Sequence, residues 1–203
     1  MSEFNYSPMF PLSKDNTEYI KISDSYIKTS LINDTEILLV DPEALTLLSQ
    51  RAFKDVSHLL RKSHLQQLKD ILEDKDASNN DHFVALTMLK NANISSSGVL
   101  PMCQDTGTAI ILGYKGEKVF TNTDDGKYLS LGVYNTYQTN NLRFSQLAPF
   151  SMFEEKNTAN NLPAEISLFA SEGQEYKFAF VQKGGGSANK SFLFQATPAT
   201  LNY

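Results

Sequence analysis

The sequence contains one cysteine and no tryptophan in 203 residues, and its 23 acidic residues outnumber its 18 basic ones. A single cysteine cannot form an internal disulfide, which favours a reducing compartment. The net charge of −5 and the pI near 5.2 argue against a protein that neutralises nucleic-acid phosphates. No stretch approaches the roughly 18 apolar residues of a membrane span. We therefore expect neither nucleic acid nor membrane as a partner.

The first 50 residues contain no arginine and several acidic side chains, whereas mitochondrial transit peptides are rich in arginine and poor in acids. We expect a cytoplasmic protein, with a mitochondrial location as the open alternative. With 41% hydrophobic residues and no excess of glycine or proline, the composition is that of a globular chain. A chain of this length forms one domain, or part of one.

Two short strands and three helices are predicted before the cysteine. Apolar runs at residues 19–22 and 36–40 indicate strands. Asp41 and Pro42 are typical of a helix start. A second helix is expected from Ser63, with Gln66 completing a capping box. In the first helix, apolar side chains recur mostly every three or four residues and should share its buried face: Leu45, Leu48, Ala52, Val56, Leu59 and Leu60. A third helix should begin at residue 81, fray at residues 91–93 and point these side chains inward: Phe83, Leu86 and Leu89.

Strands dominate the pattern after the cysteine. The apolar run at residues 108–114 predicts a buried strand, followed by a turn at Lys115 and Gly116. Large side chains recur at helical spacing in residues 126–140, which predicts a helix. Residues 165–170 and 176–182 alternate around a polar turn, as in a β-hairpin. We therefore predict an α/β fold, with mixed α and β elements and helices packed on a mixed sheet.

Cys103 lies in an unusual setting, the segment GVLPMCQDTGT at residues 98–108. A lone cysteine is usually a small buried hydrophobic residue. The polar run that follows Cys103 suits an apolar core poorly, because its side chains need hydrogen-bond partners. Backbone amides in such a loop can favour a thiolate that acts as a nucleophile or a metal ligand. The segment therefore points weakly to a functional site.

Two further segments could bind an anion. KGGGSANK at residues 183–190 combines unobstructed amides with two lysines, as in an anion-binding nest, although a flexible turn is an equally good interpretation. It lacks the spacing of a nucleotide P-loop. Arg143 has a planar side chain that matches a carboxylate, although most arginines are surface charges. The three histidines have no ligand-like spacing to Cys103 and are interpreted as structural: His58, His64 and His82.

A series of segments, in the same order along the chain, resembles the class I, iron–sulfur-dependent fumarate hydratases. The strongest is GVLPMCQDTGTAI at residues 98–110, which is similar to the cluster-binding segment of that family. The others are DPEALTLL (41–48), SHLLRKSHLQQLKDIL (57–72), FVALTMLKNANI (83–94), NLRFSQLAP (141–149), NNLPA (160–164) and KGGGSANK (183–190). Collinear similarity over nearly the whole chain is much more specific than any one motif.

The resemblance implies a hydro-lyase that interconverts malate and fumarate through a [4Fe-4S] cluster. Three cysteines hold such a cluster, and its open iron acts as a Lewis acid on the departing hydroxyl group. By the same resemblance, Cys103 is one cluster ligand, Gln104 and Asp105 contact the substrate, Arg143 clamps a carboxylate and Gly186 offers its amide. Asp105 is also the expected group for proton transfer. Charged and hydrogen-bonding partners of these kinds suit a dicarboxylate.

The chain departs from the family in length and cysteine content. The resemblance implies longer single chains with two further cysteine ligands, so we expect an incomplete N-terminal portion of the catalytic domain, without the C-terminal domain. Its expected parts are an arm with short strands (1–40), a helical segment (41–97), and the cluster loop, strands and glycine-rich loop (98–203). One thiolate cannot hold a cluster, so we expect the chain alone to be inactive.

Alternative functions remain open from the sequence. The chain could be a non-catalytic remnant or an anion-binding module, or it could act on another hydroxy-dicarboxylate such as tartrate. The resemblance further implies a homodimer in the full-length enzyme and a small dicarboxylate as the partner molecule.

Overall fold

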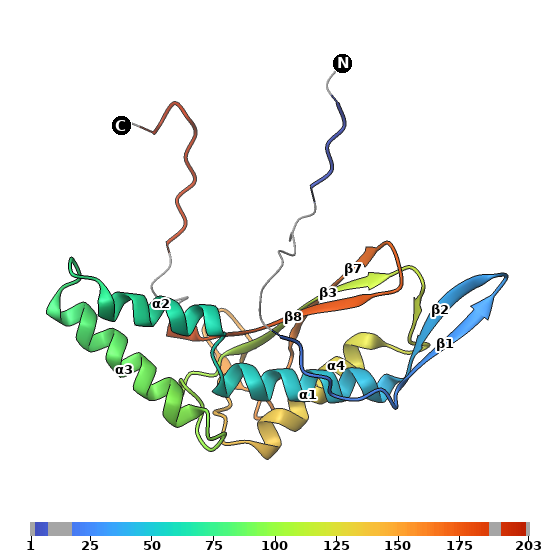
Figure 1. Ribbon diagram of the computed structural model, residues 1–203, viewed down its shortest axis with the longest axis horizontal. Coiled ribbons are helices and arrows are strands. Elements are labelled where there is room, and N and C mark those ends of the chain that lie inside the picture. The colour runs from blue at the N-terminus through green and yellow to red at the C-terminus, as the bar shows by residue number, and fades with distance from the viewer. Residues whose placement is uncertain (1–2, 8–17, 187–191, 202–203) are drawn as a thin grey trace.

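The computed structural model describes residues 3–7, 18–186 and 192–201. Its helices lie beside and below a twisted sheet, with one helical pair and one strand pair extending in opposite directions (Figure 1). The strands are β1 (Ile27–Ile32), β2 (Thr35–Val40), β3 (Thr108–Gly116), β4 (Val119–Phe120), β5 (Leu147–Pro149), β6 (Glu155–Asn157), β7 (Glu165–Ser171) and β8 (Tyr176–Lys183). The helices are α1 (Pro42–His58), α2 (Lys62–Glu73), α3 (Asn79–Ser95) and α4 (Asp125–Thr139). The predicted α/β class, with helices packed on a mixed sheet, is confirmed.

The main sheet has the strand order β7-β3-β8, with β3 parallel to β7 and antiparallel to β8. Ile111 in β3 lies opposite Ile166 on one side and Phe180 on the other. The predicted hairpin of β7 and β8 is therefore wrong, because β3 lies between these strands. The apolar residues Ala109 and Ile111 of β3 are fully buried, which suits a strand at the centre of the sheet.

The hydrophobic core lies between this sheet and the helices α1 and α4. It joins Leu45 and Phe53 of α1 to Leu129 and Val133 of α4 and to Ile111 of β3. Phe53 also meets Phe180 edge to face, with ring centroids 5.5 Å apart. Burying apolar surface at about 25 cal/mol per Å² makes this layer a main source of stability.

The buried face of α1 differs from the predicted one, of which only Leu45 is buried. The face is instead formed by Leu45, Thr46, Ser49, Phe53, Ser57 and His58. Helix α4 approaches α1 so closely that a Cβ atom at Gly132 would lie 2.5 Å from the Thr46 carbonyl oxygen. Small residues are needed there, and the Ser49 hydroxyl donates to the Leu129 carbonyl at 2.8 Å. The buried face of α1 thus has small residues in close contact with α4 in place of most of the predicted apolar residues.

The helix starts are partly as predicted. Asp41 caps α1 by accepting a hydrogen bond from the Glu43 amide at 3.0 Å. The capping box expected at Ser63 is wrong, since α2 begins at Lys62 and Gln66 donates to Asp70 within the helix. A capping box is formed instead at α3, between Ser78 and the residue three positions later, Asp81.

Helix α3 packs through small residues rather than through the large apolar ones expected. Ala85, Ala92 and Ser95 are buried, whereas Phe83 is 69% exposed and Leu86 is also exposed. The helix continues to Ser95 and does not fray at residues 91–93. Helices α2 and α3 form a pair that extends from one end of the molecule (Figure 1), so much of their surface faces solvent.

Four local predictions can be compared directly with the backbone. Residues 19–22 are irregular, and the strand that pairs with β2 is β1, eight residues further on. The strand over residues 36–40 and the helix over residues 126–140 are confirmed as β2 and α4. The turn expected at Lys115 and Gly116 is wrong, because both belong to β3 and the turn follows at Glu117 and Lys118. None of the described helices has the length and apolar character that crossing a membrane requires.

Candidate functional site

The loop between α3 and β3 carries Cys103, and its first half is tied to two helices. The Met102 amide donates to the Ser57 carbonyl of α1 at 3.0 Å. The Met102 carbonyl accepts from the Asn91 side chain of α3 at 2.7 Å. Cys103 and Gln104, which follow directly, are exposed. The cysteine is therefore presented on a fixed backbone rather than sealed in the core.

The second half of the loop is buried and hydrogen bonded. The Tyr137 hydroxyl of α4 donates to the Thr106 carbonyl at 3.0 Å, and burial is the main cause of the raised pKa of Tyr137. The Thr106 hydroxyl donates to the Arg143 carbonyl at 2.6 Å. The Gly107 amide donates to the Ser145 hydroxyl at 3.1 Å. These contacts join the cysteine loop directly to the segment that contains Arg143.

The glycine-rich segment lies against the same loop. The Gly186 amide donates to a carboxylate oxygen of Asp105 at 3.2 Å. A Cβ atom at Gly184 would lie 2.9 Å from that oxygen, so a larger residue there would require the Asp105 side chain to shift. Residues 187–190 of the predicted anion-binding segment lie outside the described residues. An amide of the described part therefore already holds a carboxylate, although that carboxylate belongs to the chain itself.

Arg143 is anchored through its backbone while its side chain is exposed. Within the described ranges, its guanidinium makes no hydrogen bond or ion pair with another residue. The fork is thus available for an anion such as a carboxylate. The structure brings the segments of Cys103, Gln104 and Asp105, Gly186 and Arg143 together, and the roles assigned to these residues remain predictions.

Asn161 is a residue of this region that the sequence did not single out. It is fully buried and has a positive φ of 56°, which asparagine tolerates better than most residues. Its side chain contacts both the cysteine loop and the segment after Arg143. The only signal for it is its place in NNLPA, one of the segments that resemble the family, where asparagine and proline are also ordinary loop residues.

The donor set does not fit an iron–sulfur cluster on its own. The whole sequence has one cysteine, and no group of three or more His, Cys, Asp or Glu side chains that could hold a metal lies within residues 3–7, 18–186 and 192–201. A [4Fe-4S] cluster needs several thiolate ligands. A cluster at Cys103 would therefore require ligands from outside these 203 residues.

Two of the histidines interpreted as structural make backbone contacts. His58 is buried, with its Nδ1 atom 2.7 Å from the Lys54 carbonyl oxygen, and its Nε2 atom has no hydrogen-bond partner among the described residues. His82 lies near the start of α3, with its Nε2 atom 2.9 Å from the Asp74 carbonyl oxygen. Among the residues that the structure describes, neither histidine belongs to a group of three or more potential metal ligands.

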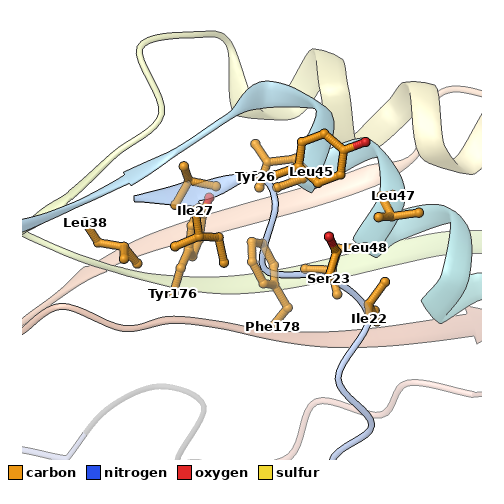
Figure 2. A pocket seen from close by; sticks show the side chains of 12 residues that line it. Ile22, Ser23, Tyr26, Ile27, Leu38, Leu45, Leu47, Leu48, Tyr176 and Phe178 are labelled. Atoms are coloured by element: carbon orange, nitrogen blue, oxygen red, sulfur yellow. The ribbon is translucent and has the colours of Figure 1, made fainter. Parts of the chain in front are cut away.

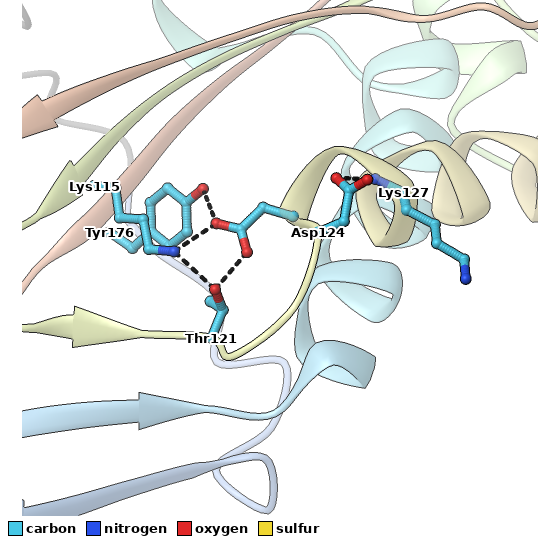
Figure 3. Close-up of polar contacts among 6 residues, drawn as sticks. Lys115, Thr121, Asp124, Lys127 and Tyr176 are labelled. Carbon is cyan, nitrogen blue, oxygen red and sulfur yellow. Dashed lines mark hydrogen bonds and ion pairs between the residues drawn. The ribbon is translucent and has the colours of Figure 1, made fainter.

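A separate buried polar cluster links β3, α4 and β8 (Figure 3). The Lys115 ammonium donates to Thr121 at 2.7 Å and to Asp125 at 2.8 Å, and the Tyr176 hydroxyl donates to Asp125 at 2.9 Å. Burial favours a higher pKa for Asp125, but the hydrogen bonds from Lys115, Thr121 and Tyr176 outweigh it and lower the pKa. Burial and Asp125 raise the pKa of Tyr176. The Asp125 carboxylate is thus fully engaged within the protein, which is typical of a structural cluster.

An apolar cavity of about 190 Å³, lined by no residue of the cysteine loop, lies between residues 22–27, the β1–β2 pair, α1 and β8 (Figure 2). Tyr26, Leu48, Tyr176 and Phe178 are among its lining residues, and all the lining residues are uncharged. A dicarboxylate would lose its hydration there without gaining a cationic partner. This cavity is therefore a poor site for the predicted substrate class.

The known proteins to which this chain is similar are described as fumarate hydratases. The family model described as fumarate hydratase (Fumerase) matches residues 46–202. The chain is 54% identical over 198 residues to the aerobic class I fumarate hydratase of Escherichia coli K12, covering 98% of this chain and 36% of the relative. It is 55% identical over 207 residues to the mitochondrial fumarate hydratase 1 of Leishmania major, covering 100% of this chain and 37% of the relative. The chain thus spans about a third of the length of these relatives.

Proposed function

The chain belongs to the fumarate hydratase (Fumerase) family, and we propose that it forms one part of an active site that interconverts fumarate and malate. The observation that carries the proposal is the contact between the Gly186 amide and the Asp105 carboxylate, next to the anchored backbone of Arg143. Three segments distant in the sequence meet there. Together they offer a cationic fork, an amide donor and a carboxylate, which suit the binding and deprotonation of a hydroxy-dicarboxylate.

The proposed roles are those that the family resemblance implies, and the chemistry of each residue suits its role. Arg143 binds one substrate carboxylate through its two parallel N–H groups. Gln104 and the Gly186 amide donate hydrogen bonds to the remaining oxygens of the substrate. Asp105 takes the proton from the carbon next to a carboxylate when malate loses water, and returns it in hydration. Before the substrate binds, the amide of Gly186 donates to the Asp105 carboxylate and holds it in place.

Cys103 is proposed as one thiolate ligand of a [4Fe-4S] cluster. The other ligands have to come from outside these 203 residues, because the sequence has no second cysteine. The proposal extends to a homodimer, which the family resemblance implies. It also extends to a cytoplasmic location, which the lone cysteine and the arginine-free, acidic first 50 residues support. One relative is named as mitochondrial, so that compartment is the alternative to test.

A chimera tests the proposed function. In this chimera, the chain replaces the matching third of the aerobic Escherichia coli enzyme. The chimera and the chain alone are each reconstituted with iron and sulfide, and the dehydration of malate is measured for both. We expect activity only in the chimera, and loss of both activity and cluster in its Cys103→Ser variant. Activity or cluster uptake by the chain alone would contradict the donor-set argument. Binding of malate with no turnover in any form would favour an anion-binding module.

Arg143→Lys in the chimera tests the carboxylate clamp. Loss of a charge-assisted bidentate contact costs about 1.5–3 kcal/mol, so KM for malate should rise by about 10- to 150-fold. Arg51→Lys is the matched control, because Arg51 is a surface residue of α1 that pairs with Asp55 at 2.9 Å. An unchanged KM in Arg143→Lys would refute the role of this side chain. Higher activity on tartrate than on malate would change the substrate assignment but not the site.

A further inference from the structure

Asn161 lies at the junction of the two segments that carry the proposed catalytic and binding residues. Its side-chain oxygen accepts hydrogen bonds from the amides of Ser145 at 2.9 Å and Gln146 at 3.1 Å. Its side-chain nitrogen donates to the Gly107 carbonyl at 3.0 Å. One end of the carboxamide therefore holds the segment after Arg143, and the other end holds the segment after Asp105.

The side chain of Asn161 is fully buried, so each of these hydrogen bonds replaces contacts with water. A buried carboxamide can serve a pair of N–H groups on one side and a carbonyl group on the other, which no other side chain of this size does. Aspartate has the same shape, but it would place a carboxylate oxygen against the Gly107 carbonyl. The site thus requires asparagine for its chemistry as well as its size.

We propose that Asn161 is a positioning residue, whose carboxamide fixes the separation between the segment of Arg143 and the segment of Asp105. The inference rests on the proposed function, in which Arg143 binds a carboxylate while Asp105 transfers a proton of the same substrate. Both groups act on one small molecule, so an error in their separation cannot be corrected by moving the substrate. A displacement of about 1 Å can reduce the rate by about 100-fold.

Other contacts between the same segments make Asn161 a spacer rather than their sole connection. The Gly107 amide donates to the Ser145 hydroxyl at 3.1 Å, and the Thr106 hydroxyl donates to the Arg143 carbonyl at 2.6 Å. These bonds keep the segments together when Asn161 is replaced. Substitution should therefore change their spacing and order before it unfolds the chain.

Asn161→Asp is the informative variant, because it keeps the acceptor for the Ser145 and Gln146 amides but removes the donor to Gly107. Amide hydrogen exchange of the 203-residue chain measures each segment separately. The Gly107 amide donates to Ser145 and not to Asn161, so its exchange reports how firmly its segment is held; we expect it to accelerate by up to about tenfold when the segment loses the hydrogen bond at the Gly107 carbonyl. Exchange at Ser145 and Gln146 should stay as in the unmodified chain. In Asn161→Ala, exchange should accelerate at all three amides.

Thr136→Val provides a control for a general loss of stability. Thr136 is also fully buried, but its hydroxyl donates within the α1–α4 contact, to the carbonyls of Gln50 at 3.2 Å and Gly132 at 2.8 Å. Ser145→Ala is a second test, since it removes another contact with Gly107 without introducing a charge. It should accelerate exchange at Gly107 as well.

Kinetics of the chimera measure the effect on function. We expect Asn161→Asp to lower kcat by up to about 100-fold with KM for malate nearly unchanged, because the segment of Arg143 keeps its support. Thr136→Val should change neither parameter. Equal effects of Asn161→Asp and Thr136→Val on both exchange and kcat would overturn the inference. If the unmodified chimera is inactive, the proposed function fails, and the exchange pattern still decides whether Asn161 sets the spacing.

Discussion

Replacing Gly107 by alanine should destabilise the chain much more than the same change at Gly98, at the other end of the cysteine loop. Both glycines have positive φ angles, 57° at Gly107 and 74° at Gly98. At Gly107, a Cβ atom would overlap the backbone carbonyl of Lys183, whereas at Gly98 no described atom lies within 4 Å of it. Comparing the two variants therefore separates the free-energy cost of a positive φ angle from the cost of the steric overlap with Lys183.

The magnitudes decide which site is more sensitive. Placing alanine in the left-handed region costs roughly 1–2 kcal/mol at either position, and a less flexible unfolded chain returns about 0.4–1 kcal/mol. The Gly98→Ala variant should thus lose no more than about 1.5 kcal/mol. Gly107→Ala adds a steric overlap worth about 1–3 kcal/mol, and the overlapping group is backbone that cannot rotate away. We expect the two variants to differ by about that amount.

Urea unfolding followed by circular dichroism measures this difference. The midpoint should fall clearly in Gly107→Ala and only slightly in Gly98→Ala, with similar slopes in both. The same change at Gly107 should separate Lys183 from the cysteine loop and so weaken the nearby contact between Gly186 and Asp105. Equal midpoints for the two variants would refute the close approach of the glycine-rich segment to this loop.

Three further predictions concern helix packing and buried polar contacts in the fold. Gly132→Ala should lower Tm by roughly 2–8 °C because α4 packs against the backbone of α1 there, whereas Gly126→Ala in the same helix should not, and equal Tm values would contradict the packing argument. Asp125→Asn should lower the free energy of unfolding by about 1–3 kcal/mol at pH 7, because it removes the charged partner of the Lys115 ammonium. Because the pKa of Asp125 is lowered in the folded state, its contribution is present at neutral pH and is lost as the pH falls below about 4, so a difference that stays constant from pH 7 to pH 3 would argue against the ion pair. Tyr137→Phe should cost about 1–2 kcal/mol, measured by thermal unfolding, since it leaves a buried carbonyl of the cysteine loop without its donor.

Local signals in the sequence predicted the elements that local chemistry determines. The start of α1 depends on Asp41 and Pro42, and both act within one helical turn. The β3 strand and the α4 helix follow from apolar runs and helical spacing that need no distant partner. The candidate site was found by resemblance of collinear motifs, because one cysteine, one arginine and three glycines are too common to identify a site by themselves.

The features that the sequence did not reveal depend on distant contacts. Strands β7 and β8 have the pattern of a hairpin, and only the insertion of β3 between them shows otherwise. The buried face of α1 is set by Gly132, more than 70 residues away, which selects Thr46 and Ser49 over leucine. Asn161 matters through backbone groups of two other segments, and backbone partners leave no mark in residue types.

The contrast between exposed and buried residues in the candidate site bears on its chemistry. Cys103, Gln104 and Arg143 are exposed, while Gly107 and Asn161 beneath them are buried and hydrogen bonded. An ion pair between an exposed arginine and a carboxylate contributes only about 0–1 kcal/mol in water. The same fork acts much more strongly where water is excluded, because the effective dielectric constant is lower. The strength with which the proposed groups hold a dicarboxylate therefore depends on how far water is excluded from them, as well as on their spacing.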